Sequence, residues 1–276
     1  MVGSEAFRYD GKRVLVVGGA TGIGAAAAQI VAALGAELIV MDHARVAYPA
    51  KQVVEVDLRD RAGIDAALDQ IAGPVHAVFS AAGVADGTPG LMKINFIAHR
   101  HILERLLADA RLGRGGAICM ISSVAGLGWE AKVPTLLELL STSSYESADA
   151  WVKAHEGTDN YMFSKQAIGC YVARQSFPLL AKGIRINAIC PGPTDTPLAR
   201  ANAAMWLGFA QDYRDATGTP HLTPEQMGDT MAFLNSDAAS GISGVSLLVD
   251  TGHIMSSLAG SYEPGQAIAR FLLGRS

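Results

Sequence analysis

Short apolar runs alternate with longer amphipathic stretches along most of the chain. Helical patterns lie at 25–35, 61–73, 90–111 and 160–181. Between and around them are seven short runs with the length and β-branched composition of buried strands, at 13–17, 37–42, 52–57, 75–83, 115–123, 184–192 and 245–250. Such alternation builds a parallel sheet with helices on both faces. It predicts one α/β domain over 1–276, with a doubly wound, mostly parallel, seven-stranded sheet.

The composition agrees with one large core and argues against several classes of partner. Half of the 276 residues are hydrophobic and the net charge is −4, without any run of Lys or Arg, so no nucleic acid is expected. Cys119, Cys170 and Cys190 are far apart in apolar surroundings, which predicts buried thiols in a reducing cytoplasm. The N-terminal segment lacks the apolar core of a signal peptide, so a cytoplasmic protein is expected.

Two further classes of site are also not expected. Residues 14–36 carry no charge and are long enough to suggest a membrane span, but four glycines interrupt the stretch, so we expect no membrane segment. His99 and His101 are two apart on a predicted helix, where their side chains cannot converge on one ion. No HExxH motif is present, and we expect no metal site.

A glycine-rich turn separates the first strand from the first helix. Gly18, Gly22 and Gly24 have the spacing that permits a tight turn, close approach of a pyrophosphate and close packing of helix on strand. The context predicts a dinucleotide site. Asp42 ends the next strand, where a carboxylate binds the adenosine ribose hydroxyls and repels a 2′-phosphate, which favours NAD. Arg45 lies nearby, so NADP remains a possible cofactor. A second alternative is that Asp42 is only a solvated side chain at the end of a strand, without a role in cofactor binding.

Tyr161 and Lys165 lie four residues apart in a predicted helix. They therefore share one face, and Tyr161 is the only one of seven tyrosines with Lys at this position. The spacing alone is equally compatible with two residues on a helix face that have no catalytic role. The pair gains meaning only from the motifs around it.

Several motifs in order make residues 11–252 resemble the short-chain dehydrogenase/reductase family. SAAG (80–83) stands where the family usually has NNAG, and ISSVAG (121–126) matches its serine strand. Asn95, Ser123, Tyr161 and Lys165 match the catalytic positions. The resemblance implies a Rossmann-like fold and NAD(P) bound by Gly18, Ala20, Thr21, Gly22, Ile23, Gly24, Asp42, Asp57, Leu58, Ala82, Gly83, Tyr161, Lys165, Pro191, Gly192, Thr194 and Thr196.

The resemblance also implies a role for each catalytic residue. Tyr161 is expected to be the general acid/base, and Lys165 to lower its pKa and anchor the cofactor ribose. Ser123 would bind the substrate oxygen, and Asn95 would hold a water relay to Lys165. The neighbouring Ser122 is expected to be structural.

Two segments depart from the family's usual length or composition. Ser123 and Tyr161 are 38 positions apart, which predicts a helical insertion at about 128–158. The insertion is either a surface elaboration or a lobe that shapes the substrate entrance or subunit packing. A similar insertion occurs in bacterial 3α-hydroxysteroid dehydrogenase/carbonyl reductases, the subgroup that the chain resembles. A substrate lid is expected at about 195–222. Met205, Trp206 and Phe209 there form either ordinary helix packing or the wall of a site for a hydrophobic substrate.

The resulting hypothesis is an oxidoreductase that interconverts a hydrophobic secondary alcohol, such as a hydroxysteroid, and its ketone with a nicotinamide cofactor. Asp42 favours NAD, and a homo-oligomer (dimer or tetramer) is expected. Two alternatives stay open: an NADP-dependent carbonyl reductase, and a dinucleotide sensor without turnover. The sensor is disfavoured because it has no need of all four catalytic residues.

Overall fold

The computed structural model describes residues 3–275, in which seven strands form one sheet. Every neighbouring pair is parallel and the order is β3-β2-β1-β4-β5-β6-β7. The predicted doubly wound fold is confirmed, with all rather than most of these pairs parallel. The strands are β1 (Arg13–Val17), β2 (Glu37–Asp42), β3 (Gln52–Glu55), β4 (Val75–Ser80), β5 (Leu112–Ile121), β6 (Arg185–Pro191) and β7 (Ser246–Val249).

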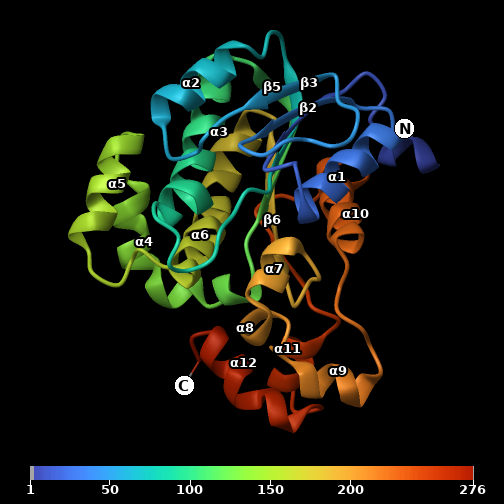
Figure 1. The fold of residues 1–276 in the computed structure, drawn as a ribbon, viewed down its shortest axis with the longest axis vertical. Helices are drawn as coiled ribbons and strands as arrows, with labels where there is room; N and C mark the ends of the chain where they lie inside the picture. The colour runs from blue at the N-terminus through green and yellow to red at the C-terminus, as the bar shows by residue number, and fades with distance from the viewer. Residues whose placement is uncertain (1–2, 276) are drawn as a thin grey trace.

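Helices cover both faces of the sheet (Figure 1). On one face α1 (Gly22–Ala33) packs against α10 (Pro224–Asn235). On the other lie α2 (Arg61–Asp69), α3 (Ala98–Ala108) and α6 (Tyr161–Ala181), and each face has its own apolar core. The three cysteines are buried, and no helix within 3–275 is both long and apolar enough to cross a bilayer. Burial on both faces explains the nearly unbroken apolar strands.

Local signals in the sequence fix several helix ends. α10 starts with a capping box, in which Thr223 and Gln226 exchange side-chain and backbone hydrogen bonds and Pro224 occupies the first turn. α2 starts after Asp60, whose carboxylate accepts from the Ala62 amide at 3.1 Å. These caps satisfy backbone donors that the helix itself leaves unpaired.

The structure differs from the sequence pattern in two places. The predicted helix at 90–111 contains a π-helical segment, η2 (Lys93–Ile97), directly before α3. The chain after β7, for which the pattern predicted nothing, folds into α11 (His253–Leu258), the turn η6 (Glu263–Gly265) and α12 (Gln266–Leu272). The other short helical turns are η1 (Gly3–Phe7), η3 (Val124–Gly126), η4 (Trp129–Lys132) and η5 (Asp237–Ala239).

The segment between β5 and α6 holds two helices, α4 (Val133–Leu140) and α5 (Tyr145–Ala154). α4 packs on α6, and Arg100 of α3 ties this segment down. The nearly buried Arg100 guanidinium donates to the Leu139 carbonyl at 3.3 Å and to the Thr142 hydroxyl at 3.0 Å. From α5, the Tyr145 hydroxyl donates to the Leu58 carbonyl at 2.7 Å. The insertion is therefore fastened to α3, to α6 and to the loop that contains Leu58.

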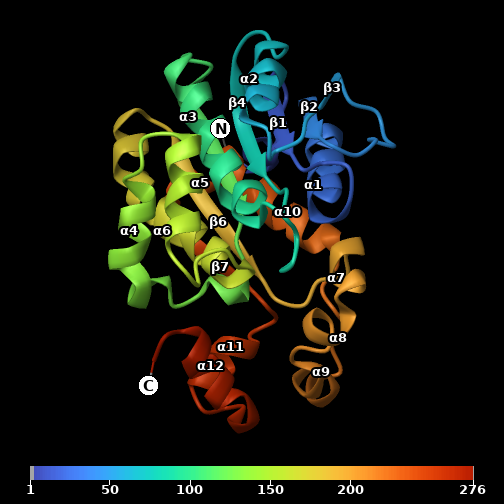
Figure 2. The ribbon, with the colours of Figure 1, turned by 60° about the vertical axis from the view of Figure 1, so that its left-hand side comes forward.

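Five short helices gather beyond the carboxyl ends of the strands (Figures 1 and 2). They are α7 (Pro197–Ala201), α8 (Ala203–Trp206) and α9 (Gln211–Thr217), together with α11 and α12. His253 of α11 is buried among the rings of Phe209, Tyr213 and Tyr262, with centroid distances of 4.9 to 6.1 Å. These ring contacts tie the segment of α7–α9 to the C-terminal helices.

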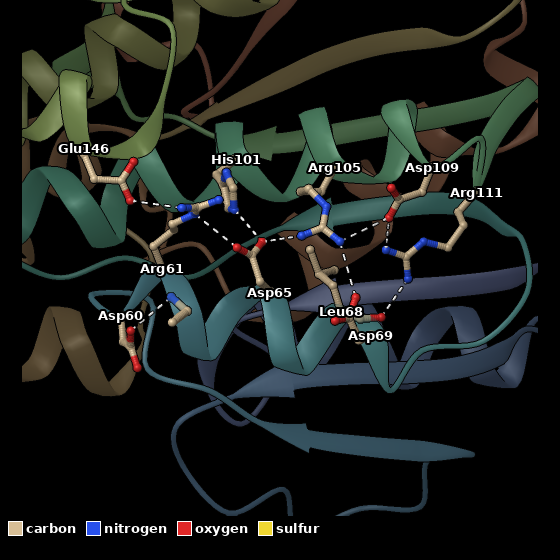
Figure 3. Close-up of polar contacts among 11 residues, drawn as sticks. Asp60, Arg61, Asp65, Leu68, Asp69, His101, Arg105, Asp109, Arg111 and Glu146 are labelled. Atoms are coloured by element: carbon tan, nitrogen blue, oxygen red, sulfur yellow. Dashed lines mark hydrogen bonds and ion pairs between the residues drawn. The ribbon is translucent and has the colours of Figure 1, made fainter.

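A network of charged side chains joins α2 to α3 (Figure 3). The carboxylate of Asp65 lies 2.6 Å from Arg105, 2.8 Å from His101 and 3.0 Å from Arg61. Burial alone would raise the pKa of Asp65, but the His101 hydrogen bond and the two arginine charges outweigh it and leave that pKa below its ordinary value. Arg61 continues to Glu146 of α5 at 3.5 Å.

We predict that Asp65→Asn lowers the free energy of unfolding at pH 7 by about 1 kcal/mol, because it removes the charge shared by three partners. A depressed folded pKa stabilises the protein above about pH 4, the ordinary aspartate value, and this contribution is lost as pH falls through the folded value. The difference between variant and wild type should therefore shrink in acid, as measured by urea unfolding. Asp69→Asn is the control, since Asp69 is 69% exposed and 3.3 Å from Arg105. Equal losses in the two variants would contradict this.

Candidate active site

One large cavity, of about 670 Å³, opens at the carboxyl ends of the strands. Parallel strands end at the same edge, so residues far apart in the sequence meet there. Of the predicted cofactor and catalytic residues, only Ala20 and Asn95 do not line this cavity. Those that do are Gly18, Thr21, Gly22, Ile23, Gly24, Asp42, Asp57, Leu58, Ala82, Gly83, Ser123, Tyr161, Lys165, Pro191, Gly192, Thr194 and Thr196.

The glycine turn forms one end of the cavity wall. Gly18 and Gly22 have φ of +83° and +58°, which other residues rarely adopt. A Cβ on Gly18 would overlap the backbone of Ala82, and one on Gly24 would overlap the carbonyl of Gly18. The side chain of the N-cap residue Thr21 makes no hydrogen bond to the first turn of α1. The backbone N–H groups of that turn are therefore available to bind an anion at this end of the cavity.

Asp42 lies at the end of β2 beside this turn. Its carboxylate accepts from the amides of Ala20 and Ala44, each at 2.8 Å, and its side chain is only 9% exposed. A negative charge held there fits two ribose hydroxyls and opposes a phosphate. The glycine turn, the open helix start and this carboxylate together fit an NAD-type dinucleotide.

Asp57, which the family resemblance places near the adenine ring of the cofactor, lies beside an arginine. Its carboxylate is 45% exposed and pairs with Arg59 at 2.7 Å; that hydrogen bond lowers the pKa of Asp57. Arg59 also lines the cavity, a residue that the sequence did not single out. An adenine at this end would therefore meet an ion pair rather than a lone carboxylate.

Asn95 sits in the π-helical segment η2 and is fully buried. Its amide oxygen accepts from the Val84 N–H at 2.8 Å, and its amide nitrogen donates to the Val84 carbonyl and the Ser164 hydroxyl. These direct bonds occupy the side chain and fix the loop after β4 to helix α6. The water relay to Lys165 stays a prediction. A Cβ on Gly83 would lie 3.6 Å from Oδ1 of Asn95.

Ser123 and Tyr161 meet although 38 positions separate them. Ser123 follows β5 and accepts from the Ala125 amide at 3.1 Å, while Tyr161 starts α6 directly after its N-cap, Asn160. The Ser123 side chain lies close enough to the Tyr161 phenol to lower its pKa in part. The first turn of α6 therefore places the phenol at the end of β5.

Lys165 lies one turn further along α6 and is buried. Its Nζ donates to the Ile121 carbonyl at 2.9 Å and lies 5.4 Å from the centroid of the Tyr161 ring. Ser122 donates to the backbone carbonyl of Lys165 at 2.8 Å, the structural position expected for it. Two hydrogen bonds between the end of β5 and α6 thus hold the lysine under the tyrosine.

Burial shifts the pKa values of both Tyr161 and Lys165. Burial raises the pKa of Tyr161 to about 12, although Ser123 lowers it in part. Burial also lowers the pKa of Lys165 to about 8. In the protein itself, loss of water around the phenol and the Asp86 charge both raise the pKa of Tyr161. The lowering expected from Lys165 stays a prediction for the cofactor-bound enzyme.

The far end of the cavity is apolar and comes from three segments of the chain. The Trp206 and Tyr161 ring centroids lie 4.8 Å apart. The wall there is formed by Met162, Leu198, Ala199, Met205, Trp206, Phe209, Ile268, Phe271 and Leu272. The sequence drew attention to the region 195–222 but missed α12, although Ile268, Phe271 and Leu272 have the i, i+3, i+4 spacing of one helix face.

The insertion does not contribute to this wall. No residue between Ala125 and Tyr161 lines the cavity. The reading in which the insertion shapes the substrate entrance is therefore wrong for this structure, because its helices pack on α3 and α6 instead. Asp86, by contrast, lines the cavity and was not foreseen from the sequence, where nothing marks it.

Known proteins resemble this chain in both sequence and fold. The short chain dehydrogenase model matches residues 12–134, and the enoyl-(acyl carrier protein) reductase model matches residues 137–253. A coniferyl-alcohol dehydrogenase from a Pseudomonas species is 28% identical over 87% of this chain and 96% of its own. The cis-4-hydroxycyclohexanecarboxylate dehydrogenase of Sinomonas cyclohexanicum is 31% identical over 88% and 96%.

A comparison with a solved structure shows the same relationship at the level of the fold. The 3-alpha-hydroxysteroid dehydrogenase of a Pseudomonas species, complexed with NADH, superposes with a TM-score of 0.71 at 25% identity. The match covers 91% of this chain and 99% of that one, and it agrees with the subgroup that the sequence resembles. With these matches along nearly its whole length, the chain belongs to the short-chain dehydrogenase/reductase family of NAD(P)-dependent oxidoreductases.

Proposed function

We propose that this protein interconverts a bulky, hydrophobic secondary alcohol and its ketone, with NAD as the preferred cofactor. The observation that carries the proposal is the position of the Tyr161 phenol, which lines the same cavity as the glycine turn and the apolar wall. An alcohol in the apolar part would therefore lie next to both the phenol and the cofactor.

The reaction needs a proton acceptor for the alcohol and a hydride acceptor for its carbon. The bound nicotinamide would supply or accept the hydride. In oxidation the Tyr161 phenolate would take the hydroxyl proton, and in reduction the phenol would return it to the new alkoxide. The Ser123 hydroxyl would hold the substrate oxygen, and the buried Lys165 charge would stabilise the phenolate.

The wall of the cavity supports a substrate with a large apolar body. Trp206, Phe209 and Phe271 offer aromatic faces, while the side chain of Met205 adapts to different shapes. Relatives named for coniferyl alcohol and for a 3-alpha-hydroxysteroid fit a site of this kind. A hydroxysteroid or aryl-substituted alcohol is the class that we propose.

Asp42 supports NAD rather than NADP. A 2′-phosphate would bring negative charge to a carboxylate that is already nearly buried and holds two backbone amides. The NADP-dependent alternative has Arg59 at the same end of the cavity in its favour, but Asp57 already neutralises that guanidinium.

Assembly into a dimer or tetramer is part of the same proposal. Helix α4 covers part of α6, whereas Phe177 and Leu180 near the other end of α6 are 83% and 54% exposed. Apolar side chains this exposed favour contact with a second subunit.

We predict that Tyr161→Phe lowers kcat at least about a thousandfold, because no other group can exchange the alcohol proton. NADH binding, measured by fluorescence titration, should be unchanged. Tyr171→Phe is the matched control: it removes a hydroxyl from the same helix, away from the cavity. Turnover by Tyr161→Phe close to that of Tyr171→Phe would eliminate the mechanism.

We predict that Asp42→Asn lowers the preference for NADH over NADPH at least about tenfold in Kd, because it removes the charge and keeps an oxygen for the Ala20 amide. Both constants can be measured by titrating the cofactor fluorescence. Glu37→Gln, at the opposite end of the same strand, is the control. An unchanged ratio in Asp42→Asn would refute the role given to Asp42.

We predict that oxidation depends on pH between about 6 and 8, whereas reduction does not. Because the pKa of Tyr161 is raised, the phenol is protonated at neutral pH and ready for reduction. Oxidation needs the phenolate, so its kcat/KM should rise about tenfold per pH unit between about 6 and 8. The gain should level off as Lys165 loses its charge above about 8. Initial rates in both directions test this, and an oxidation rate that falls with rising pH would contradict it.

A further inference from the structure

Asp86 lies in the loop after β4 and touches the start of the catalytic helix. Its Oδ1 accepts from the Tyr161 backbone N–H at 2.6 Å. The residue is exposed and lines the cavity. The carboxylate is thus held within one side-chain length of the phenol that reacts.

The distribution of charge around the cavity makes this position unusual. Four ionisable residues of the wall, Asp42, His43, Asp57 and Arg59, lie at or just after the ends of β2 and β3 at the dinucleotide end. Near the phenol the wall carries two more, Asp86 and Lys165. Lys165 is buried under the Tyr161 ring and donates to a backbone carbonyl. Among the described residues of the wall near the phenol, Asp86 therefore carries the exposed charge.

We propose that Asp86 is a specificity-determining residue that makes the site select uncharged alcohols and ketones and disfavour those that carry a carboxylate. The inference rests on the proposed function, because it refines the substrate class of that same cavity. An acidic group on the substrate would approach the exposed Asp86 charge, while the Lys165 cation lies buried under the phenol ring. At separations of several ångströms in a partly solvated site, this repulsion corresponds to roughly fivefold discrimination.

The charge and the hydrogen bond of Asp86 can be separated experimentally. Asp86→Asn keeps an oxygen that accepts from the Tyr161 N–H, so the first turn of α6 stays capped. It removes only the charge. If Asp86 acts solely as a cap, Asp86→Asn leaves substrate selection unchanged.

The same charge acts on the catalytic phenol. The groups that face Tyr161 are Ser123 after β5, Lys165 on α6, Cys190 of β6 and Asp86, and Asp86 is one of those that raise the pKa of Tyr161. Removing it should favour the phenolate and raise kcat/KM for oxidation about two- to threefold at each pH between about 6 and 8. A purely structural role would not produce this gain.

The test uses two ketones of equal ring size, 4-oxocyclohexanecarboxylate and its methyl ester. Their Kd values are measured by quenching of protein fluorescence with NAD⁺ bound, a state in which no hydride is available to reduce them. Their kcat/KM values are measured separately with NADH. We expect wild type to favour the ester, and Asp86→Asn to reduce this preference about fivefold in both quantities.

Asp159→Asn is the matched control. Asp159 is an exposed carboxylate two residues before Tyr161, close to the same helix start, and does not line the cavity. Its replacement removes the same net charge and should leave the ester preference and the kcat/KM for oxidation at wild-type values. Equal preferences in Asp86→Asn and wild type would overturn the proposal. So would a wild type that binds both ketones equally or binds neither.

The measurements distinguish failure of the proposed function from failure of the role proposed for Asp86. If no ketone or alcohol is turned over by wild type, the proposed function fails, and the ratio of Kd values still decides the role of Asp86. If turnover is normal and this ratio is the same in wild type and Asp86→Asn, the charge selection fails while the proposed function stands.

Discussion

The site depends on the junction between the end of β5 and helix α6. Two hydrogen bonds make this junction: Ser122 donates to the Lys165 carbonyl, and Lys165 donates to the Ile121 carbonyl. Burial of an ammonium is costly, and the carbonyl partner offsets only part of that cost, which is why the pKa of Lys165 falls. In return the junction fixes the angle of α6, and with it the position of the Tyr161 phenol beside Ser123.

Much of the fold is readable from the sequence because its parallel strands are buried on both faces. Each appears as an apolar run, and the seven strands fall within the predicted runs or within a few residues of them. The C-terminal helices were not readable. α11 and α12 are six and seven residues long, too short for a convincing periodicity, and they exist because Ile254, Ala269 and Leu272 bury against Val124 and its neighbours.

The candidate site divides in the same way. Residues set by a local turn or by a strand end, such as Gly18, Asp42 and Ser123, could be placed from motif order alone. Asp86 could not, because its contact with Tyr161 joins positions 75 residues apart. The direction of the Tyr161 pKa was also beyond the sequence. Spacing reveals that a lysine is one helical turn away, but not how much water the surrounding chain removes from the phenol.

The two ends of the cavity are built from different materials, and this difference explains how one fold serves different substrates. The dinucleotide end consists of strand termini and a glycine turn, whose positions the sheet fixes. The other end consists of short helices with exposed side chains, among them Met205 at 73% and Phe271 at 65%. Replacements there change the wall without disturbing the sheet. Relatives at 25 to 31% identity can therefore keep the fold while their names record different alcohols. In this chain we propose that α7–α8, α12 and the charge of Asp86 select the substrate.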